Sequence, residues 1–325
     1  MRARMSLTIR RAEKRDRPAL LRLFEEVFAE RLDPAVWEWK YDANPFPAAS
    51  VAALDGEDAV GFFGGFGTRY RGTLFDGPGV SGVDVMTSRS ARRLGHAGLY
   101  RSLGERFVEE NRRLGIPFYF GFPNDRHRVI GERVLGFRTV EKAGEWSRPI
   151  GEASFLSGLR RRLRRLTPSD GLSEAHDSLA EALHSRPGLR TDRSRATLSW
   201  RYGSRPLSGY LLVELLDPAG RSRAFAAVRI VAERAILADI QALDEESGEV
   251  VDLLEAVSAR ARGYGATTLV LRAARASRMA ARALELGFVE SSSDACLELI
   301  PVDPSFPLDP VAAGFDYRFG DHDVF

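Results

Sequence analysis

The feature that most constrains the fold is an internal repeat. The segment WKYDANP (residues 39–45) and the segment WRYGSRP (residues 200–206) share the pattern Trp, basic residue, Tyr, three residues, Pro. A helix-like segment precedes each copy, and two strand-like segments around a turn follow it. One order of elements that occurs twice predicts the tandem duplication of a single domain.

The repeat continues beyond these segments. Each half next has a strand with a central acid, Asp84 in GVDVMT and Asp239 in LADIQA. A helix (98–115 and 250–265), a short apolar strand (116–122 and 266–272) and a second helix follow, and each half then closes on a Gly-Phe pair. This pattern predicts alternating helices and strands in both halves.

Charge and composition exclude several classes of protein. The 47 basic and 45 acidic residues nearly cancel, which argues against a nucleic-acid-binding surface. The single cysteine, Cys296, excludes an internal disulfide, and the five histidines lack the spacing of a metal-ligand set. The sequence shows no signal-peptide core and no apolar run of about 18 residues. We therefore expect a cytoplasmic protein without a membrane segment, a nucleic-acid partner or a metal.

The stretch RRLGHAG, residues 92–98, lies between the Asp84 strand and the following helix. The start of a helix offers unpaired N–H groups and the positive end of the helix dipole, which favour phosphate. Small residues there let the backbone approach a ligand, and Arg92 and Arg93 add charge-assisted hydrogen bonds. The sequence therefore predicts an anion-binding loop.

This loop resembles the pyrophosphate-binding signature Q/R-x-x-G-x-G/A of the GNAT superfamily of N-acyltransferases, with Arg92, Gly95 and Ala97 at the signature positions. DVMTSRSARRLGHAG and GFPND (residues 121–125) resemble tandem-repeat members of that superfamily, including the enhanced intracellular survival acetyltransferases. Arg89 stands where a proline is common in that group.

The resemblance implies an α/β (α+β) fold with two tandem domains, each a twisted, mixed, mostly antiparallel sheet flanked by helices. We expect an N-terminal domain over residues 1–150 that binds acyl-coenzyme A, and a degenerate C-terminal domain over 186–302. An Arg-rich linker over 151–185 joins them, and a tail over 303–325 follows. The arginines at 160–165 suit either a solvated helix or an anionic partner.

The resemblance also assigns the residues that bind acetyl-coenzyme A as co-substrate. Backbone groups of Val85, Met86 and Thr87 would contact the pantetheine arm, and Asn124 would lie near the thioester. The residues that would surround the pyrophosphate are Arg92, Arg93, Leu94, Gly95, His96, Ala97 and Gly98. The Asp84 strand would splay from its neighbour and leave backbone donors for the thioester carbonyl. The second half has the acidic stretch DEESGEVV (residues 244–251) near this place, so we expect no coenzyme A there.

The catalytic residues stay open between alternatives. Asp84 is the candidate base, because a carboxylate in an apolar strand is costly to bury, but Asp239 in the other half favours a structural role. Many GNAT enzymes have a tyrosine acid where this chain has Glu132, so the acid is Glu132 with a raised pKa, solvent or another group. By resemblance, Asp321, Asp323 or the carboxylate of Phe325 would line the acceptor pocket.

The function that these residues favour is an acetyl-coenzyme A-dependent N-acyltransferase. The acceptor would be the amine of a small molecule, such as an amino sugar or a natural-product intermediate, which attacks the thioester directly. One alternative is a Fem-type aminoacyl-tRNA-dependent transferase. That class needs no pyrophosphate loop, so the presence of the loop in this chain argues against it. The other is a non-catalytic acyl-coenzyme A-binding scaffold, which Glu132 in place of tyrosine would permit. The acceptor, the acyl chain and the oligomeric state stay open.

Overall fold

A computed structural model describes residues 7–93, 98–151, 166–207 and 209–322, without the side chains of Arg92 and Arg93. Two mixed, mostly antiparallel sheets flanked by helices confirm the expected α+β class and the tandem architecture. The chain divides into two compact units. Unit 1 holds Met1–Tyr70, Asp76–Glu141 and Ala295–Ala312, and unit 2 holds Arg71–Phe75, Lys142–Asp294 and Ala313–Phe325. Each unit therefore contains segments that are distant in the sequence.

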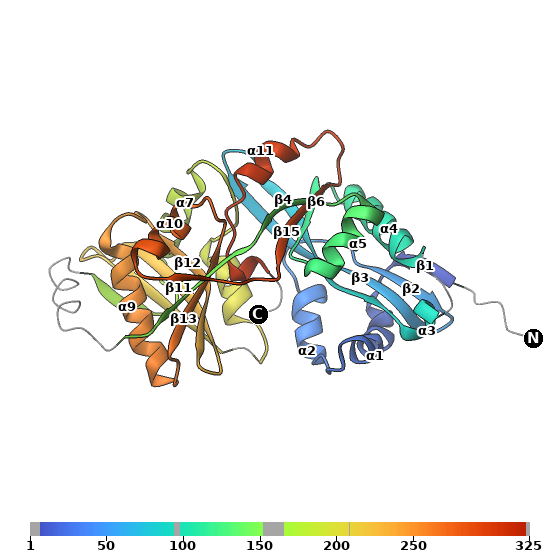
Figure 1. The fold of residues 1–325 in the computed structure, drawn as a ribbon, viewed down its shortest axis with the longest axis horizontal. Helices are drawn as coiled ribbons and strands as arrows, with labels where there is room; N and C mark the ends of the chain where they lie inside the picture. The colour runs from blue at the N-terminus through green and yellow to red at the C-terminus, as the bar shows by residue number, and fades with distance from the viewer. Residues whose placement is uncertain (1–6, 94–97, 152–165, 208, 323–325) are drawn as a thin grey trace, which may run out of the picture. The chain divides into compact units, whose positions relative to one another are not determined.

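The sheet of unit 1 has the strand order β1-β2-β3-β4-β5-β15-β6. Its strands are β1 (Leu7–Arg11), β2 (Val51–Asp55), β3 (Asp58–Gly72), β4 (Gly77–Thr87), β5 (Phe118–Gly121), β15 (Cys296–Pro301) and β6 (Arg138–Lys142). Its helices are η1 (Lys14–Asp16), α1 (Arg17–Phe28), α2 (Pro34–Trp37), the π-helical turn η2 (Glu38–Asp42), α3 (Arg89–Arg93), α4 (Leu99–Arg113), α5 (Asp125–Leu135) and α11 (Leu308–Ala313). Helices α1 and α2 cover one face of this sheet, and α4 and α5 cover the other (Figure 1).

The packing of unit 1 follows from the spacing of apolar residues along its helices. In α4, Leu99, Leu103 and Phe107 recur every four residues and are buried in one cluster with Phe63 of β3. In α1, Leu20 and Leu23 are buried in a second cluster, which contains Phe62 of the same strand. Because successive residues of a strand face opposite sides, β3 supplies a hydrophobic surface to the helices on both faces.

The sheet of unit 2 has the strand order β14-β7-β13-β12-β11-β10-β8. Its strands are β14 (Val289–Ser291), β7 (Gly144–Pro149), β13 (Thr268–Ala273), β12 (Arg234–Ala242), β11 (Ser222–Val231), β10 (Tyr210–Leu216) and β8 (Thr167–Asp170). Strand β9 (Leu189–Thr191) is not part of this sheet and pairs with β3. Its helices are α7 (His176–His184), α8 (Arg195–Leu198), the π-helical turn η3 (Ser199–Gly203), α9 (Gly248–Gly263), α10 (Arg278–Glu285) and η4 (Phe319–Asp321). The repeated segments thus have the same secondary structure in both halves, including the π-helical turn at each Trp-basic-Tyr pattern.

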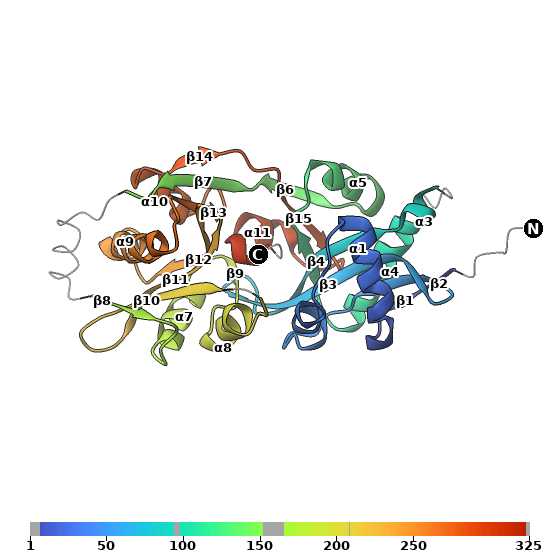
Figure 2. The same cartoon turned by 90° about the horizontal axis from the view of Figure 1, so that it is seen from below.

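The two halves of the chain exchange one strand each. Strand β15, from the second half, pairs antiparallel with β5, with Leu299 opposite Phe120. Strand β7, from the first half, pairs antiparallel with β13, with Trp146 opposite Leu271. Figure 2 shows β7 beside β14 and β13. Each sheet is therefore completed by a strand from the other half of the chain.

The segment expected as a linker is partly built into unit 2. Residues 167–170 form β8, which pairs with β10 at the edge of the sheet, and residues 176–184 form α7. An edge strand tolerates Pro168, because a proline lacks the N–H that a central strand must donate. The Arg-rich residues 152–165 lie outside the described residues. Among the helices that the structure describes, none has both the length and the hydrophobicity needed to cross a bilayer.

Candidate active site

A β-bulge in β4 positions the carboxylate of Asp84. The register between β3 and β4 pairs Phe62 with Met86 and then Gly64 with Val83, so two residues of β4 oppose one residue of β3. Asp84 lies in this bulge and has a φ of 47°, in the left-handed region that residues other than glycine rarely adopt. Such a conformation costs about 1–3 kcal/mol and re-aims a side chain, and it is common at functional sites.

Two donors from the first copy of the repeat hold Asp84. Its Oδ2 accepts hydrogen bonds from Lys40 Nζ at 2.7 Å and from Tyr41 Oη at 2.6 Å. Both donors belong to the π-helical turn η2, and the side chains of Lys40 and Asp84 are 7% and 14% exposed. Both donors bind Oδ2, and no hydrogen bond to Oδ1 is found among the described residues. A carboxylate held in this way still has one oxygen that can accept a proton.

The pairing of β4 with β5 ends before this acid. The parallel register of β4 and β5 joins Val80 to Tyr119 and Ser81 to Phe120, whereas β4 continues to Thr87. Over 82–87 the β5-facing edge of β4 therefore has no partner in this register. Val85, Met86 and Thr87 lie on that edge, with Met86 buried towards α1 and Val85 packed on the α4 face. That their backbone groups contact a co-substrate stays a prediction.

The predicted anion-binding loop is only partly described. Arg92 and Arg93 end α3, and Gly98 caps α4, which begins at Leu99. Leu94, Gly95, His96 and Ala97 lie outside the described residues, as do Asp323 and Phe325 of the tail. Asn124 caps the start of α5, and its Oδ1 accepts a hydrogen bond from the backbone N–H of His127 at 3.0 Å.

Glu132 on α5 has partners that stabilise its charged form. Its Oε1 accepts hydrogen bonds from Thr139 Oγ1 at 2.6 Å and from Arg128 Nη1 at 3.0 Å. These contacts lower the pKa of Glu132 below its ordinary value. The hydrogen bond from Thr139 has the largest effect, and the hydrogen bond and charge of Arg128 add to it. A general acid near neutral pH needs the opposite shift, so Glu132 does not have the raised pKa that its candidate role requires.

Glu298 on the exchanged strand β15 is an acid that the sequence analysis missed. Its side chain is 3% exposed, and its Oε1 lies 3.4 Å from Thr139 Oγ1. Burial raises the pKa of Glu298 to about 7, and the neighbouring charge of Glu132 adds to the shift. The available signal was the one that identified Asp84, an acid in an apolar strand, because Leu297 and Leu299 flank Glu298.

The corresponding place in unit 2 is filled by the protein itself. Asp239 is fully buried, its Oδ2 lies 2.6 Å from Arg193 Nε, and Tyr202 Oη donates to it at 3.3 Å. Arg193 also binds both oxygens of Asp321, at 3.1 and 2.8 Å. Gly320 of η4 leaves no space here, because a Cβ on it would lie 2.0 Å from Tyr202 Oη. This acid therefore has a structural environment.

Asp321 is predicted to line the acceptor pocket, but the protein's own residues surround its carboxylate. Besides Arg193, it accepts hydrogen bonds from Thr191 Oγ1 at 2.6 Å and from the N–H of Arg318 at 2.7 Å, and it is 7% exposed. These partners account for the carboxylate without a substrate. We therefore leave it out of the candidate site.

The start of α9 in unit 2 also has its own anion. Glu249 lies in the first turn and is buried, and it accepts hydrogen bonds from Arg223 Nε at 2.8 Å and from the N–H of Asp244 at 3.1 Å. A carboxylate at this helix start repels phosphate. This observation supports the expectation that unit 2 binds no coenzyme A.

Comparisons with solved structures agree with this architecture. A conserved protein of unknown function from Enterococcus faecalis V583, described as a probable N-acyltransferase, is similar with a TM-score of 0.68 and 10% identity over 92% of this chain and 73% of that one. A GCN5-related N-acetyltransferase from Kribbella flavida has a TM-score of 0.65 and 14% identity, and the match covers 92% and 72%. A fungal multi-domain β-N-acetylglucosaminidase with a GCN5-related glucosamine N-acetyltransferase region has a TM-score of 0.64 and 11% identity over 91% and 38%.

Sequence comparison alone detects none of this, because no family model and no curated protein matches the chain. At 10–14% identity the structural likeness establishes the fold and not the activity. It extends over both sheets, since each match covers more than nine tenths of the chain. The chain therefore has the GNAT N-acetyltransferase fold, with two mixed sheets that indicate tandem GNAT domains.

Proposed function

We propose that the protein is an acetyl-coenzyme A-dependent N-acyltransferase whose active site lies in unit 1. The observation that carries the proposal is the bulged end of β4, where Asp84 is held by Lys40 and Tyr41 beside an edge that β5 leaves unpaired. The edge supplies backbone donors, and the bulge supplies an oriented carboxylate. Unit 2 has a similar bulge in β12 and an edge that β13 leaves unpaired beyond Leu237, but Gly320 packs against that edge and Arg193 pairs with its acid.

The reaction needs a neutral amine, a polarised thioester and a proton for the leaving thiolate. An alkylamine has a pKa of about 10.4, so Asp84 would take a proton from the acceptor, directly or through water. The nitrogen then attacks the thioester carbon, and backbone N–H groups along 82–87 would stabilise the negative charge that develops on the carbonyl oxygen. The carbon–sulfur bond breaks, and the thiolate takes a proton.

The acceptor amine has to be identified by screening a panel of amines. We place amino sugars first in the panel, since one solved structure of this fold carries a glucosamine N-acetyltransferase region. Small-molecule amines of other kinds follow.

The test is the release of free thiol from acetyl-coenzyme A with each amine, by the wild type and by Asp84→Asn. The substitution keeps the shape of the side chain and removes the proton acceptor, so we expect kcat/KM to fall at least ~100-fold. The affinity for acetyl-coenzyme A should not change. The control is Asp58→Asn, which alters a carboxylate that is 81% exposed at the start of β3. Wild-type kinetics in Asp84→Asn would show that this carboxylate is not the base, and binding without turnover would favour the scaffold alternative.

A further inference from the structure

Glu298 lies on β15, on the opposite side of β5 from the unpaired edge of β4. In the register of β15 with β5 it stands opposite Gly121, the last residue of β5. A Cβ on Gly121 would lie 3.7 Å from the carbonyl oxygen of Gly82, which is the first residue of β4 beyond the paired region. The exchanged strand therefore brings a buried acid to the point where β5 ends, one strand away from the unpaired edge of β4.

The hydrogen bonds around Glu298 favour its protonated form. The hydroxyl of Thr139 has one proton, which it donates to Glu132 at 2.6 Å. The same oxygen lies 3.4 Å from Oε1 of Glu298, so that contact is favourable when Glu298 is the donor. Oε2 of Glu298 has no hydrogen-bond partner among the described residues, and a buried carboxylate left in this state would be costly.

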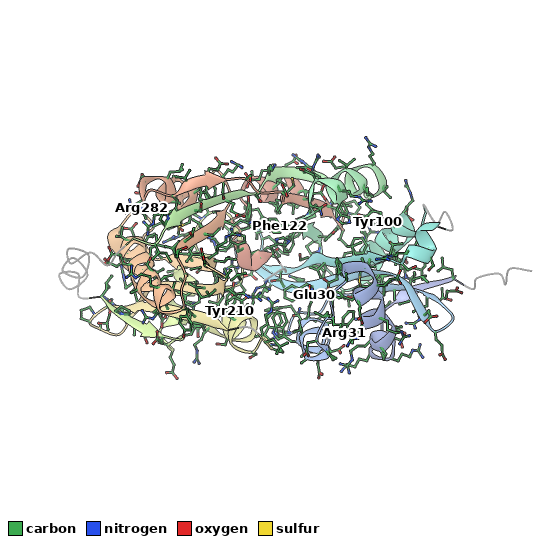
Figure 3. The ribbon with its side chains drawn as sticks, turned by 60° about the horizontal axis from the view of Figure 1, so that its bottom comes forward. Glu30, Arg31, Tyr100, Phe122, Tyr210 and Arg282 are labelled. Atoms are coloured by element: carbon green, nitrogen blue, oxygen red, sulfur yellow. The ribbon has the colours of Figure 1, made fainter. Side chains whose placement is uncertain are left out.

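Each element that packs on Glu298 contributes to this environment. Helix α5 supplies Glu132, Arg128 and Gly131, and a Cβ on Gly131 would lie 3.3 Å from Oε2. Strand β6 supplies Thr139. Helix α4 supplies Tyr100, labelled in Figure 3, and β5 supplies Tyr119; burial and the charge of Glu298 raise the pKa of both tyrosines. The tyrosines therefore stay neutral, and the charges that act on Glu298 are those of Glu132 and Arg128.

We propose that Glu298 donates the proton to the thiolate that leaves in unit 1, while Glu132, through Thr139, keeps that proton on Glu298. The proposal rests on the proposed acyl transfer. It assigns the general acid of the reaction in unit 1 to β15, a strand from the second half of the chain. It also explains why Glu132 does not need the raised pKa of a general acid.

The proton balance is closed. As the carbon–nitrogen bond forms and the carbon–sulfur bond breaks, the electron pair of the latter moves to sulfur. The O–H proton of Glu298 transfers to that sulfur, which gives the free thiol of coenzyme A and a Glu298 carboxylate. The proton that the amine loses to Asp84 passes to solvent, and solvent returns a proton to Glu298.

The decisive variant is Glu298→Gln, which preserves shape and polarity but has no acidic proton. Its matched control is Glu145→Gln, which removes a carboxylate from the other exchanged strand, β7, where Glu145 pairs with Arg272 and Arg234 at 3.2 Å. Two measurements are made on the full chain. The first is an infrared difference titration of carboxylic acid bands between acidic and alkaline pH, which needs no substrate. The second is the pH dependence of kcat for acetyl transfer.

We expect one carboxylic acid in the wild type to titrate near neutral pH, to vanish in Glu298→Gln and to persist in Glu145→Gln. The kcat of the wild type should fall about tenfold per pH unit above that point, since the acid must be protonated. Glu298→Gln should lose this alkaline decline and about 100-fold of kcat, with unchanged affinity for acetyl-coenzyme A. Glu132→Gln should move the titration of Glu298 to lower pH, because it removes a neighbouring negative charge.

The outcomes separate this proposal from the proposed function. If acyl transfer occurs and Glu298→Gln retains the kcat and the pH profile of the wild type, Glu298 is not the acid and the proposal is overturned. If the wild type shows no acyl transfer, the proposed function fails, and with it the donor role of Glu298. In that case the infrared titration still decides whether Glu298 holds a proton near neutral pH. If the wild type shows no carboxylic acid band that titrates near neutral pH, the protonated state of Glu298 is overturned as well.

Discussion

At Asp84 the backbone conformation and a neighbouring glycine together determine where the carboxylate points. The positive φ turns the residue out of the regular strand, and Tyr41 reaches it across Gly64. A Cβ on Gly64 would lie 2.5 Å from both Tyr41 Oη and the carbonyl oxygen of Val83. The absence of a side chain at position 64 is therefore a requirement of the candidate site, and it is testable with a single methyl group.

We expect Gly64→Ala to destabilise the protein by about 1–3 kcal/mol, because an overpacked site forces its neighbours to move. The displaced Tyr41 would lose its hydrogen bond to Asp84, so acyl transfer should fall as well. Urea unfolding and thiol release measure the two effects. Gly203→Ala is the control, since nothing lies within 4 Å of a Cβ there. Equal stability of the two variants would show that the bulge accommodates the methyl group.

A second residue-scale prediction concerns acid stability. Glu214 is fully buried in unit 2, where the N–H of Ser173 donates to it at 2.8 Å and His176 Nδ1 lies 3.3 Å away. Burial alone would raise the pKa of Glu214, but the neighbouring donors His176, Ser222 and Ser173 outweigh it and lower the pKa to about 2 from an ordinary value of 4.5. Such a group stabilises the fold above pH 4.5, and its contribution is lost as the pH falls towards 2.

Glu214→Gln should therefore cost roughly 3 kcal/mol of unfolding free energy at pH 7, and less as the pH falls below 4.5. Urea unfolding at pH 7, 5 and 3.5 measures the difference between variant and wild type. A difference that is the same at all three pH values would contradict the assigned pKa.

The sequence identified one of the two acids of the candidate site and not the other. Asp84 stood out because the repeat placed it in the middle of an apolar strand. Glu298 has the same apolar neighbours, but its position in the chain assigned it to the other domain. Lys40 was missed because only the fold brings it to Asp84 across 44 residues of sequence. Residue type and local pattern predicted candidates, while partners depended on contacts distant in sequence.

At the scale of elements, the order of helices and strands was predictable, and the exchange of β7 and β15 was not. Local periodicity determines that residues form a strand, but it does not specify the sheet to which the strand adds. Strand β15 contributes Leu297 and Leu299 to unit 1, each 1% exposed. It also lies between β5 and β6 in the sheet order, so its removal would leave an unpaired edge on β5 and would separate β6 from the sheet.

We therefore expect residues 1–150 expressed alone to lack a cooperative unfolding transition, because the strand that joins β6 to the rest of their sheet is missing. A peptide of residues 295–312, which belongs to the same unit, should restore the transition when it is added in trans. Urea unfolding followed by circular dichroism measures this, and a peptide with Leu299→Asp is the control. Cooperative unfolding of residues 1–150 without the peptide would show that β15 is dispensable.

At the scale of the whole molecule, duplication has produced two units with different surroundings for the same acid. In unit 1, Asp84 keeps 14% side-chain exposure and adjoins an unpaired strand edge. In unit 2, Asp239 is fully buried among Tyr202, Arg193 and Gln241, and Glu249 occupies the start of α9. We therefore predict one coenzyme A site for each chain, in unit 1.

The most direct test is a calorimetric titration of acetyl-coenzyme A into the wild type and into the double variant Arg92→Ala/Gly95→Asp, which changes the predicted pyrophosphate loop. Arg31→Ala, at a position with 84% side-chain exposure, is the control for the loss of one positive charge. We predict saturable binding with about one site per chain in the wild type and in Arg31→Ala, and no binding in the double variant. Absence of binding in the wild type, two sites per chain, or binding that the double variant retains would contradict the account.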